Sequence, residues 1–301
     1  MKKSQFYIFN ILGAVLLSCL VVGALSFDNN RTSDKETGIK YAPPKMPQQM
    51  TFGDEAVPLH RWDVKERLDR ELLFNYYSKA NVLFLLKLAN RYFPTISERL
   101  KANGVPDDFK YLCVAESNLL SGAVSRSGAV GFWQFMGGTA PGYDLTVNSQ
   151  IDQRHDVVKS TDAACAYLKR AYEKFGTWTG AAASYNCGQG GYSGQATFQK
   201  TYNYYDLLLP EETNRYIFRI LAFKHLMENA KELGFDVKEE EKYQIIPFRI
   251  VAVSISIPNL AEFAISNGTT FKILRQMNPW IRGRSLTISG GKIYEVKLPV
   301  Q

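Results

Sequence analysis

Glu116 is the only acidic residue in the stretch AESNLLSGAVSRSGAVGFWQFM, whose other residues are apolar, small, polar or basic. A carboxyl group packed among apolar neighbours at a helix end has a raised pKa, because burial disfavours its charged form. Such a group holds its proton near neutral pH and can act as a general acid. The alternative is that Glu116 only solvates the end of the helix, and the residue taken alone favours that alternative.

The residues around and beyond Glu116 are suited to binding a sugar polymer. Ser125 supplies a hydroxyl group, and the neighbouring glycines permit a polymer to approach the backbone. Gln134, an uncharged amide between two aromatic residues, can bond to the hydroxyl and N-acetyl groups of sugars. Tyr185 and Asn186 supply another hydroxyl and amide at the end of a helix of small residues. These residues favour the catalytic interpretation of Glu116.

Three acids downstream are candidates for a second catalytic carboxyl group, namely Asp144, Asp152 and Asp156. A glycoside hydrolase of the common design uses two carboxyl groups, one of them as base or nucleophile. The run DQRHD, however, predicts a structural turn in which Arg154 pairs with a neighbouring acid. Both interpretations stay open at this point.

The sequence gives little support for a metal site or a disulfide framework. The three histidines are far apart in the sequence, and no His or Cys pair has the spacing of metal ligands, so no metal or cofactor is predicted. The cysteines are Cys19, Cys113, Cys165 and Cys187. They do not form a disulfide framework, and we expect buried or half-buried thiols.

The composition is that of a folded protein with a mild basic excess. Of 301 residues, 46% are hydrophobic and 22% charged, which excludes wholesale disorder. The net charge is 36 − 29 = +7, which favours anionic surroundings such as a cell-wall polymer, lipid headgroups or nucleic acid, without distinguishing among them. No block of Lys and Arg marks a nucleic-acid arm, so no nucleic-acid partner is predicted.

Residues 1–27 have the pattern of a signal peptide or a membrane anchor. Lys2 and Lys3 precede an apolar run that ends near Phe27. Three outcomes compete: cleavage before Phe27, lipidation at Cys19, and an uncleaved membrane-spanning helix. Each of them places the rest of the chain outside the cytoplasm, in the cell envelope or periplasm, free or anchored to a membrane.

The elements that must position Glu116 are mainly helical. Residues 28–59 are polar and rich in proline, which predicts a flexible linker. Apolar residues then recur at helical spacing through 60–242, where we expect the catalytic domain. Within it, Pro94 is expected to begin a new helix, and Glu116 to lie in the last turn of a helix that starts near Pro106. Further helices are predicted over 161–175, 178–187 and 212–230.

The pattern changes after about Tyr243. FRIVAVSISI and KIYEVKLPV alternate like strands, and PNLAEFAISNGTTFKILRQMNPW between them indicates two short helices. Residues 243–301 are therefore predicted to form a small strand–helix–helix–strand unit. The predicted fold class is mainly α, with a small α/β unit at the C-terminus.

Four ordered motifs resemble one enzyme family. They are AESNLLSGAVSRSGAVGFWQFM, the following TA-x-x-Y-x-L-x-VN, then IDQRHDVVKSTDAACAYLKRAYEKFGTW, and AAASYNCGQG. Together they resemble the lytic murein transglycosylases of the soluble-lytic-transglycosylase class, relatives of goose-type lysozyme, and most of all the membrane-bound type D branch. The resemblance covers about residues 60–235 and implies a lysozyme-like helical domain. Residues 246–299 resemble the region after that domain, and a degenerate LysM peptidoglycan-binding unit.

The resemblance implies a role for each candidate residue. Glu116 would be the catalytic acid and base. The residues that it implies at the substrate are Ser125, Gln134, Met136, Tyr185 and Asn186. Ser125 would assist near an N-acetyl group, Gln134 and Met136 would line sugar subsites, and Tyr185 with Asn186 would hold the carboxyl and the reacting sugar. Departures from the family pattern occur at Leu119, Gly137, Gly138, Cys187 and Gln189, and they concern the shape of the subsites.

The implied activity explains why one acid stands alone. A lytic transglycosylase cleaves the β-1,4 bond between N-acetylmuramic acid and N-acetylglucosamine without water, and forms a 1,6-anhydromuramyl product. One carboxyl, Glu116, then serves first as acid and afterwards as base. The expected partner is the peptidoglycan glycan strand. The alternatives are a catalytically silent peptidoglycan-binding protein and a lysozyme-like hydrolase.

Overall fold

The computed structural model describes residues 42–300, of which residues 44–300 belong to one compact unit. The predictions for residues 1–27, and the beginning of the predicted linker, lie outside the described residues. Within residues 42–300, no helix is both long enough and apolar enough to cross a membrane.

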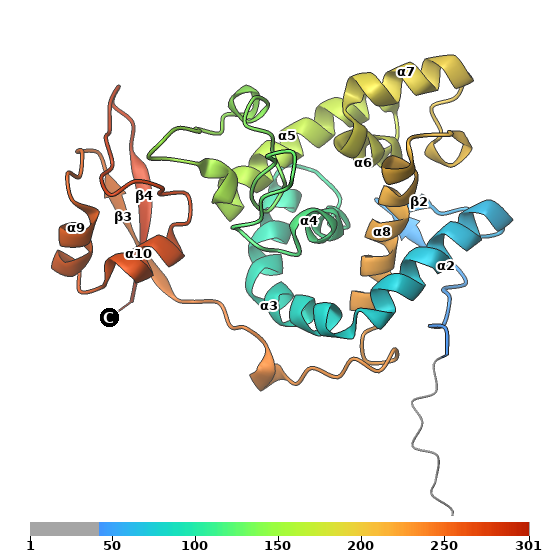
Figure 1. The fold of residues 1–301 in the computed structure, drawn as a ribbon, viewed down its shortest axis with the longest axis horizontal. Helices are drawn as coiled ribbons and strands as arrows, with labels where there is room; N and C mark the ends of the chain where they lie inside the picture. The colour runs from blue at the N-terminus through green and yellow to red at the C-terminus, as the bar shows by residue number, and fades with distance from the viewer. Residues whose placement is uncertain (1–41, 301) are drawn as a thin grey trace, which may run out of the picture. The chain divides into compact units, whose positions relative to one another are not determined.

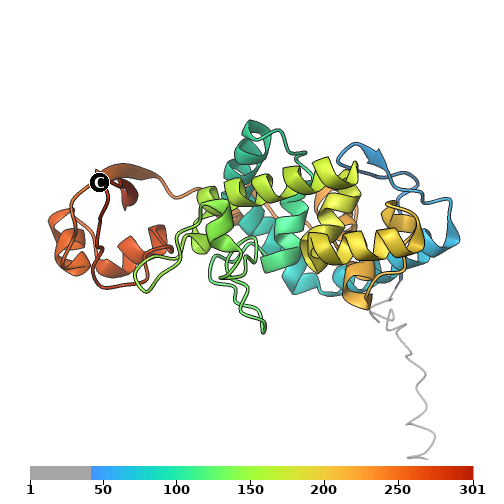
Figure 2. The ribbon, with the colours of Figure 1, turned by 90° about the horizontal axis from the view of Figure 1, so that it is seen from above.

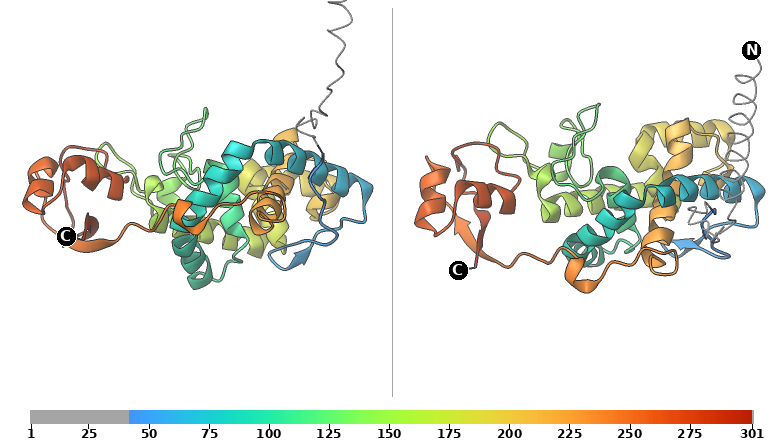
Figure 3. Two further views of the ribbon diagram at one scale, coloured as in Figure 1. Left: turned by 90° about the horizontal axis from the view of Figure 1, so that it is seen from below. Right: turned by 60° about the horizontal axis from the view of Figure 1, so that its bottom comes forward.

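A helical body fills most of the described chain (Figure 1). Its helices are α2 (Trp62–Tyr77), α3 (Lys79–Ala102), α4 (Phe109–Ser117), α5 (Val157–Phe175), α6 (Trp178–Cys187), α7 (Gln189–Gln199) and α8 (Glu211–Glu228). Helices α2 and α8 pack along each other (Figure 3). The short helix α4 packs against both α3 and α8 and has buried apolar residues on most of its circumference, as expected for a helix in the interior of a domain.

Helix α3 corrects one prediction. Pro94 does not begin a new helix, because it lies inside the continuous helix Lys79–Ala102. The proline is exposed, and the buried stripe of α3 continues past it from Leu88 to Ile96 and Leu100. Packing of that stripe outweighs the backbone hydrogen bond that the proline removes.

Two other helix boundaries differ from the prediction. Helix α5 begins at Val157 rather than near Thr161, because the Asp156 carboxylate accepts hydrogen bonds from the backbone N–H groups of Val158 and Lys159. After Gly188 (φ 76°) the chain enters α7, where the sequence predicted only a glycine turn.

The end of the predicted linker is part of the helical body. Residues 45–59, here called the N-terminal strap, contain the antiparallel pair β1 (Thr51–Phe52) and β2 (Glu55–Ala56). Phe52 is fully buried, with its ring centroid 5.0 Å from that of Phe109 in α4. The Glu55 carboxylate accepts hydrogen bonds from the backbone N–H (2.9 Å) and hydroxyl (2.7 Å) of Thr179 and so caps α6. Prolines exclude regular helices here, but they do not exclude packing.

The C-terminal unit has the predicted strand–helix–helix–strand order. Strands β3 (Phe248–Val253) and β4 (Tyr294–Pro299) are antiparallel, and α9 (Leu260–Ser266) and α10 (Phe271–Met277) lie between them in sequence. Its buried core includes Leu260, Leu274, Val296 and Leu298. Ile151 belongs to the same core, although it lies in the long connection between α4 and α5.

That connection, residues 118–156, carries several predicted site residues and reaches the C-terminal unit. Figures 2 and 3 show it leaving α4 and running beside α5, with one turn against the C-terminal unit. It contains only two short 3₁₀ turns, Ala140–Tyr143 and Gln153–His155, and is otherwise irregular. Hydrogen bonds and side-chain contacts must therefore fix its conformation.

Candidate active site

Glu116 lies in the last turn of α4, as predicted, and is half-buried. The helix ends directly after it, because Asn118 and Leu119 both adopt left-handed backbone conformations (φ 51° and 60°). Burial raises the pKa of the carboxyl to about 7 from its usual 4.5. The group is therefore poised to give up or take a proton near neutral pH.

Tyr216 holds the Glu116 carboxyl. Its phenol, on the buried side of α8, donates a hydrogen bond to Glu116 Oε1. This bond stabilises the charged form and so opposes the effect of burial on the pKa. The sequence analysis missed Tyr216. The available signal was a phenol on the apolar stripe of a long helix, since a buried tyrosine hydroxyl needs a partner.

Charged residues on α8 also act on the carboxyl. Arg219 lowers the pKa of Glu116 and Glu212 raises it, and the two are themselves paired, with Arg219 Nη1 2.9 Å from Glu212 Oε1. Glu71 of α2, only 2% exposed, pairs with Arg215 at 2.6 Å and lies 3.8 Å from Arg219. Much of the positive charge near Glu116 is thus neutralised, which leaves burial as the dominant influence on its pKa.

Tyr185 and Asn186 lie near this centre but do not bond to Glu116. Tyr185 donates a hydrogen bond to the carbonyl oxygen of Trp133 (2.7 Å), and Asn186 accepts one from the Thr213 hydroxyl (2.8 Å). Burial, and next the charge of Glu116, raises the pKa of Tyr185. The carboxyl is bonded by Tyr216, whereas Tyr185 and Asn186 tie α6 to its neighbours. The role expected of this pair at the carboxyl and the reacting sugar stays a prediction.

The other predicted substrate residues stand on the 118–156 connection. Ser125 and Met136 are exposed, and Ser125 Oγ accepts a hydrogen bond from the backbone N–H of Ala129 (3.0 Å). Gln134 has a left-handed backbone (φ 49°), and its side-chain amide donates to the carbonyl oxygens of Ala123 (3.2 Å) and Gly131 (2.8 Å). The Gln134 amide thus holds its own loop, and a contact of this residue with sugar stays a prediction.

The three candidate second carboxyl groups have other partners or surroundings. Asp152 forms a buried ion pair with Arg154 (2.8 Å), and the run DQRHD makes the predicted structural turn. Asp156 caps α5, and Asp144 is exposed at the end of a 3₁₀ turn.

Within residues 42–300, no group of three or more His, Cys, Asp and Glu side chains could hold a metal ion. Cys113 and Cys165 are buried and Cys187 half-buried, all as free thiols.

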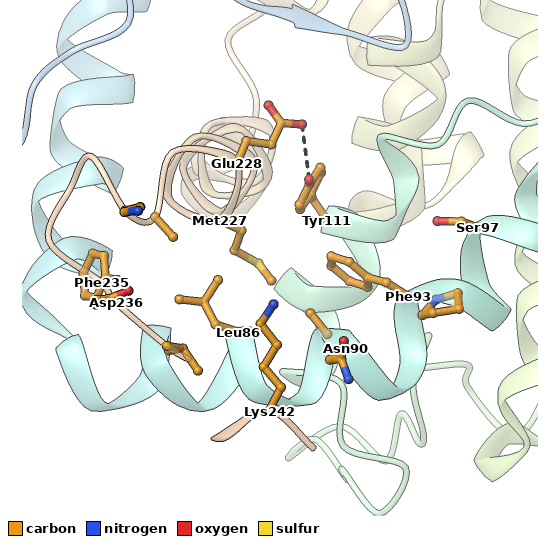
Figure 4. Close-up of a pocket in the computed structure, with 15 residues that line it drawn as sticks. Leu86, Asn90, Phe93, Ser97, Tyr111, Met227, Glu228, Phe235, Asp236 and Lys242 are labelled. Carbon is orange, nitrogen blue, oxygen red and sulfur yellow. Dashed lines mark hydrogen bonds between the residues drawn. The ribbon is translucent and has the colours of Figure 1, made fainter. Parts of the chain in front are cut away.

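A cavity of about 620 Å³ lies elsewhere in the helical body (Figure 4). Leu86, Phe93 and Met227 contribute to its apolar lining, and Tyr111 donates a hydrogen bond to Glu228 (3.2 Å) beside it. Tyr111 is on α4, but on a different face from Glu116. None of the predicted site residues lines this cavity.

The sequence of the helical body matches a known family. Residues 94–207, which include Glu116 and every other predicted site residue, match the family described as transglycosylase SLT domain. Residues 94–207 are therefore the SLT domain of this chain. Residues 249–301 match the soluble lytic transglycosylase C-terminal LysM-like domain. The resemblance drawn from the four motifs and from the C-terminal pattern is thereby confirmed.

Two curated relatives are similar in sequence to part of this chain. Membrane-bound lytic murein transglycosylase D of Escherichia coli K12 is 28% identical over 208 residues, which cover 67% of this chain and 45% of that protein. A putative tributyltin chloride resistance protein of Alteromonas sp. M-1 is 28% identical over 103 residues, 34% of this chain and 50% of that protein. This chain spans about half the length of the curated relatives it matches.

A solved structure of an inactive mutant of the lytic transglycosylase Slt from Pseudomonas aeruginosa is also similar. It is 22% identical, with a TM-score of 0.38, over 50% of this chain and 26% of that one. Tyr216 lies outside the matched SLT range, which ends at residue 207.

Proposed function

We propose that this protein is a peptidoglycan lytic transglycosylase, which cleaves the bond between N-acetylmuramic acid and N-acetylglucosamine without water. Glu116 protonates the glycosidic oxygen as the bond breaks. The deprotonated Glu116 then takes the proton of the C6 hydroxyl on the same muramyl residue, whose oxygen closes the 1,6-anhydro ring. Protons balance, because the one given to the leaving sugar is replaced by the one taken from C6.

The observation that carries the proposal is a single carboxyl with a pKa of about 7 inside an SLT domain. A group with this pKa is present in both protonation states near neutral pH, as an acid that later becomes a base must be. An intramolecular hydroxyl as nucleophile needs no activated water and has a high effective concentration. The engagement of Asp152 and Asp156 in structural contacts supports a reaction that uses one carboxyl.

Substrate contacts are proposed on the same basis. Ser125 and Met136, both exposed, would contact the sugars, and Gln134 would shape the loop that carries them. Tyr185 and Asn186 would complete the site from α6. The C-terminal LysM-like domain supports binding to peptidoglycan.

The location and the domain limits are proposed from the relatives and the sequence. We propose that the protein acts in the cell envelope, as the name of the E. coli relative suggests, with residues 1–27 as signal peptide or membrane anchor. The catalytic domain would extend to about residue 242 and the C-terminal unit from 243 onward. The catalytic domain would begin in the N-terminal strap rather than at residue 60, a limit supported by the packing of Phe52 and Glu55 against the helices.

Mass spectrometry of soluble products from purified murein sacculi tests the reaction. The wild-type protein is expected to release products lighter by one water than the corresponding reducing-end fragments. Glu116→Gln is expected to release about 10²- to 10⁴-fold less, the usual contribution of a general acid–base group. Products with ordinary reducing ends would instead establish a hydrolase. Binding to sacculi without product, by a protein shown to be folded, would establish the silent binding protein.

A further inference from the structure

One segment, residues 148–155, contacts the C-terminal unit at one end and the loop 121–136 at the other. At the first end, the Gln150 carbonyl oxygen accepts a hydrogen bond from the Arg282 N–H (2.7 Å). Its side-chain amide donates to the Ser285 hydroxyl (3.0 Å) and accepts from the Thr287 N–H (2.9 Å). Gln150 thus satisfies polar groups of the C-terminal unit with both its backbone and its side chain.

Apolar packing strengthens this end. Ile151 is 2% exposed, pairs in a β-bridge with Ile281, and belongs to the hydrophobic core of the C-terminal unit. The next residue, Asp152, donates its backbone N–H to the carbonyl oxygen of Trp280 (2.8 Å). The C-terminal unit therefore takes part of its core from the SLT domain, and it is not attached by a tether alone.

At the other end, Arg154 holds the loop that carries Ser125, Gln134 and Met136. Arg154 is buried, with its Nε and Nη2 bonded to Asp152 at 2.9 and 2.8 Å. Its Nη1 donates to the carbonyl oxygen of Phe135 (3.1 Å). The planar guanidinium makes these bonds in fixed directions, which an ammonium group could not reproduce.

Close backbone packing joins the same two segments. A side chain at Gly131 would place its Cβ 1.9 Å from the carbonyl oxygen of Arg154, so only glycine fits there. The loop 121–136 has no helix, and the β-contacts in it are isolated bridges, such as Val124 with Val130. Internal hydrogen bonds of Gln134 and the buried side chains of Phe132 and Trp133 fix part of this loop. Arg154 adds a bond from outside, at the carbonyl oxygen of Phe135 beside the exposed Met136.

We propose that the C-terminal unit, through residues 148–155, holds the loop 121–136 in its binding conformation, with Arg154 as a positioning residue for the glycan. The expected effect on substrate affinity rests on the proposed function, whereas the link between the C-terminal unit and the loop does not. Docking of Gln150 and Ile151 on the C-terminal unit fixes the position of Asp152. Asp152 in turn holds the Arg154 guanidinium, and the guanidinium holds the carbonyl oxygen of Phe135, next to Met136. The C-terminal unit then affects substrate affinity even for glycans that do not touch it.

Hydrogen exchange on the full-length chain tests the structural link. Gln150→Ala removes both side-chain bonds to the C-terminal unit, and Ser149→Ala, an exposed neighbour, is the matched control. Exchange of amides in 121–136 is expected to accelerate about tenfold in Gln150→Ala, and to stay unchanged in Ser149→Ala. Gln150→Glu, which keeps the acceptor for Thr287, is expected to restore most of the protection. Acceleration confined to residues 280–287 would overturn the proposal.

Kinetics on a short soluble glycan fragment of peptidoglycan test the positioning role. Arg154→Lys keeps the charge and loses the guanidinium geometry, and Arg284→Lys, at an exposed arginine, is its control. We expect KM to rise about tenfold in Arg154→Lys with kcat within about twofold, since binding is impaired and proton transfer is not. A fall in kcat with unchanged KM would contradict it. If the wild type forms no product, the proposed function fails, while the exchange experiment still decides the structural link.

Discussion

Two regions form the candidate site, and they are built differently. The chemical side, Glu116 with Tyr216, comes from two packed helices that each bury most of their apolar residues in the core. The binding side, with exposed Ser125 and Met136, is an irregular loop whose shape depends on hydrogen bonds from Gln134 and from a distant segment. Proton transfer needs a fixed pKa, which a packed core provides, whereas a long glycan needs an accessible surface.

This difference separates the expected effects of substitution. Changes at α4 and α8 should alter the pKa of Glu116 and the rate of the chemical step. Changes in the loop 121–136 should alter affinity and leave the pH dependence in place. Each prediction below tests one side of this division.

The largest effect is expected for Tyr216→Phe. The variant loses the hydrogen bond that orients the carboxyl and favours its charged form, so kcat should fall about 10- to 100-fold. The pKa of Glu116 should rise above about 7, and the alkaline limb of the kcat/KM–pH profile should move to higher pH. Tyr192→Phe is the matched control, since the Tyr192 hydroxyl also donates to a backbone carbonyl, that of Tyr202, and lies outside the proposed site. An unchanged pH profile in Tyr216→Phe would mean that this phenol does not act on the acid.

Stability should depend on pH through Glu116. Its pKa is about 7 in the folded protein and near 4.5 when unperturbed, so the folded state binds the proton more tightly. The free energy of unfolding therefore falls as pH rises from about 4.5 to 7. Glu116→Gln removes this loss, and should be more stable than wild type by about 1–3 kcal/mol at pH 8. Urea unfolding at pH 8 and pH 4 measures it, and an equal difference at both values would contradict it.

A smaller effect is expected for Ser125→Ala. Loss of one exposed hydroxyl at the sugar should raise KM about two- to tenfold, with kcat and the pH profile unchanged. Ser127→Ala, at an exposed serine two positions on, serves as control. A shift in the pH profile would place Ser125 on the chemical side of the site.

No effect is expected for Asp144→Asn. The side chain is exposed at the end of a 3₁₀ turn, so turnover should change less than about twofold and the products should be the same. Product analysis and rates on sacculi measure this. If the folded variant were inactive, Asp144 would be a second catalytic carboxyl and the single-carboxyl mechanism would be wrong.

The sequence predicts the parts of this molecule that depend on local patterns. The helical spacing, the position of Glu116 in a last turn and the strand–helix–helix–strand order are all present in the structure. Contacts over long sequence distances were not predictable in this way. Tyr216 is 100 residues from Glu116, and no local signal links the two. Likewise, Pro94 marks a helix start by local rules, but tertiary packing carries α3 through it.

The N-terminal strap has a consequence for the order of folding. It precedes the helices in the chain, yet its partners come late: the Glu55 carboxylate caps α6 124 residues on, and the Lys224 amine donates to the Thr51 carbonyl across 173 residues. Contacts that close such long loops form after local ones, because the entropy of loop closure opposes them. The strap can therefore take its place only when α8 has packed, so the segment that comes before the helices in sequence is among the last to fold onto them.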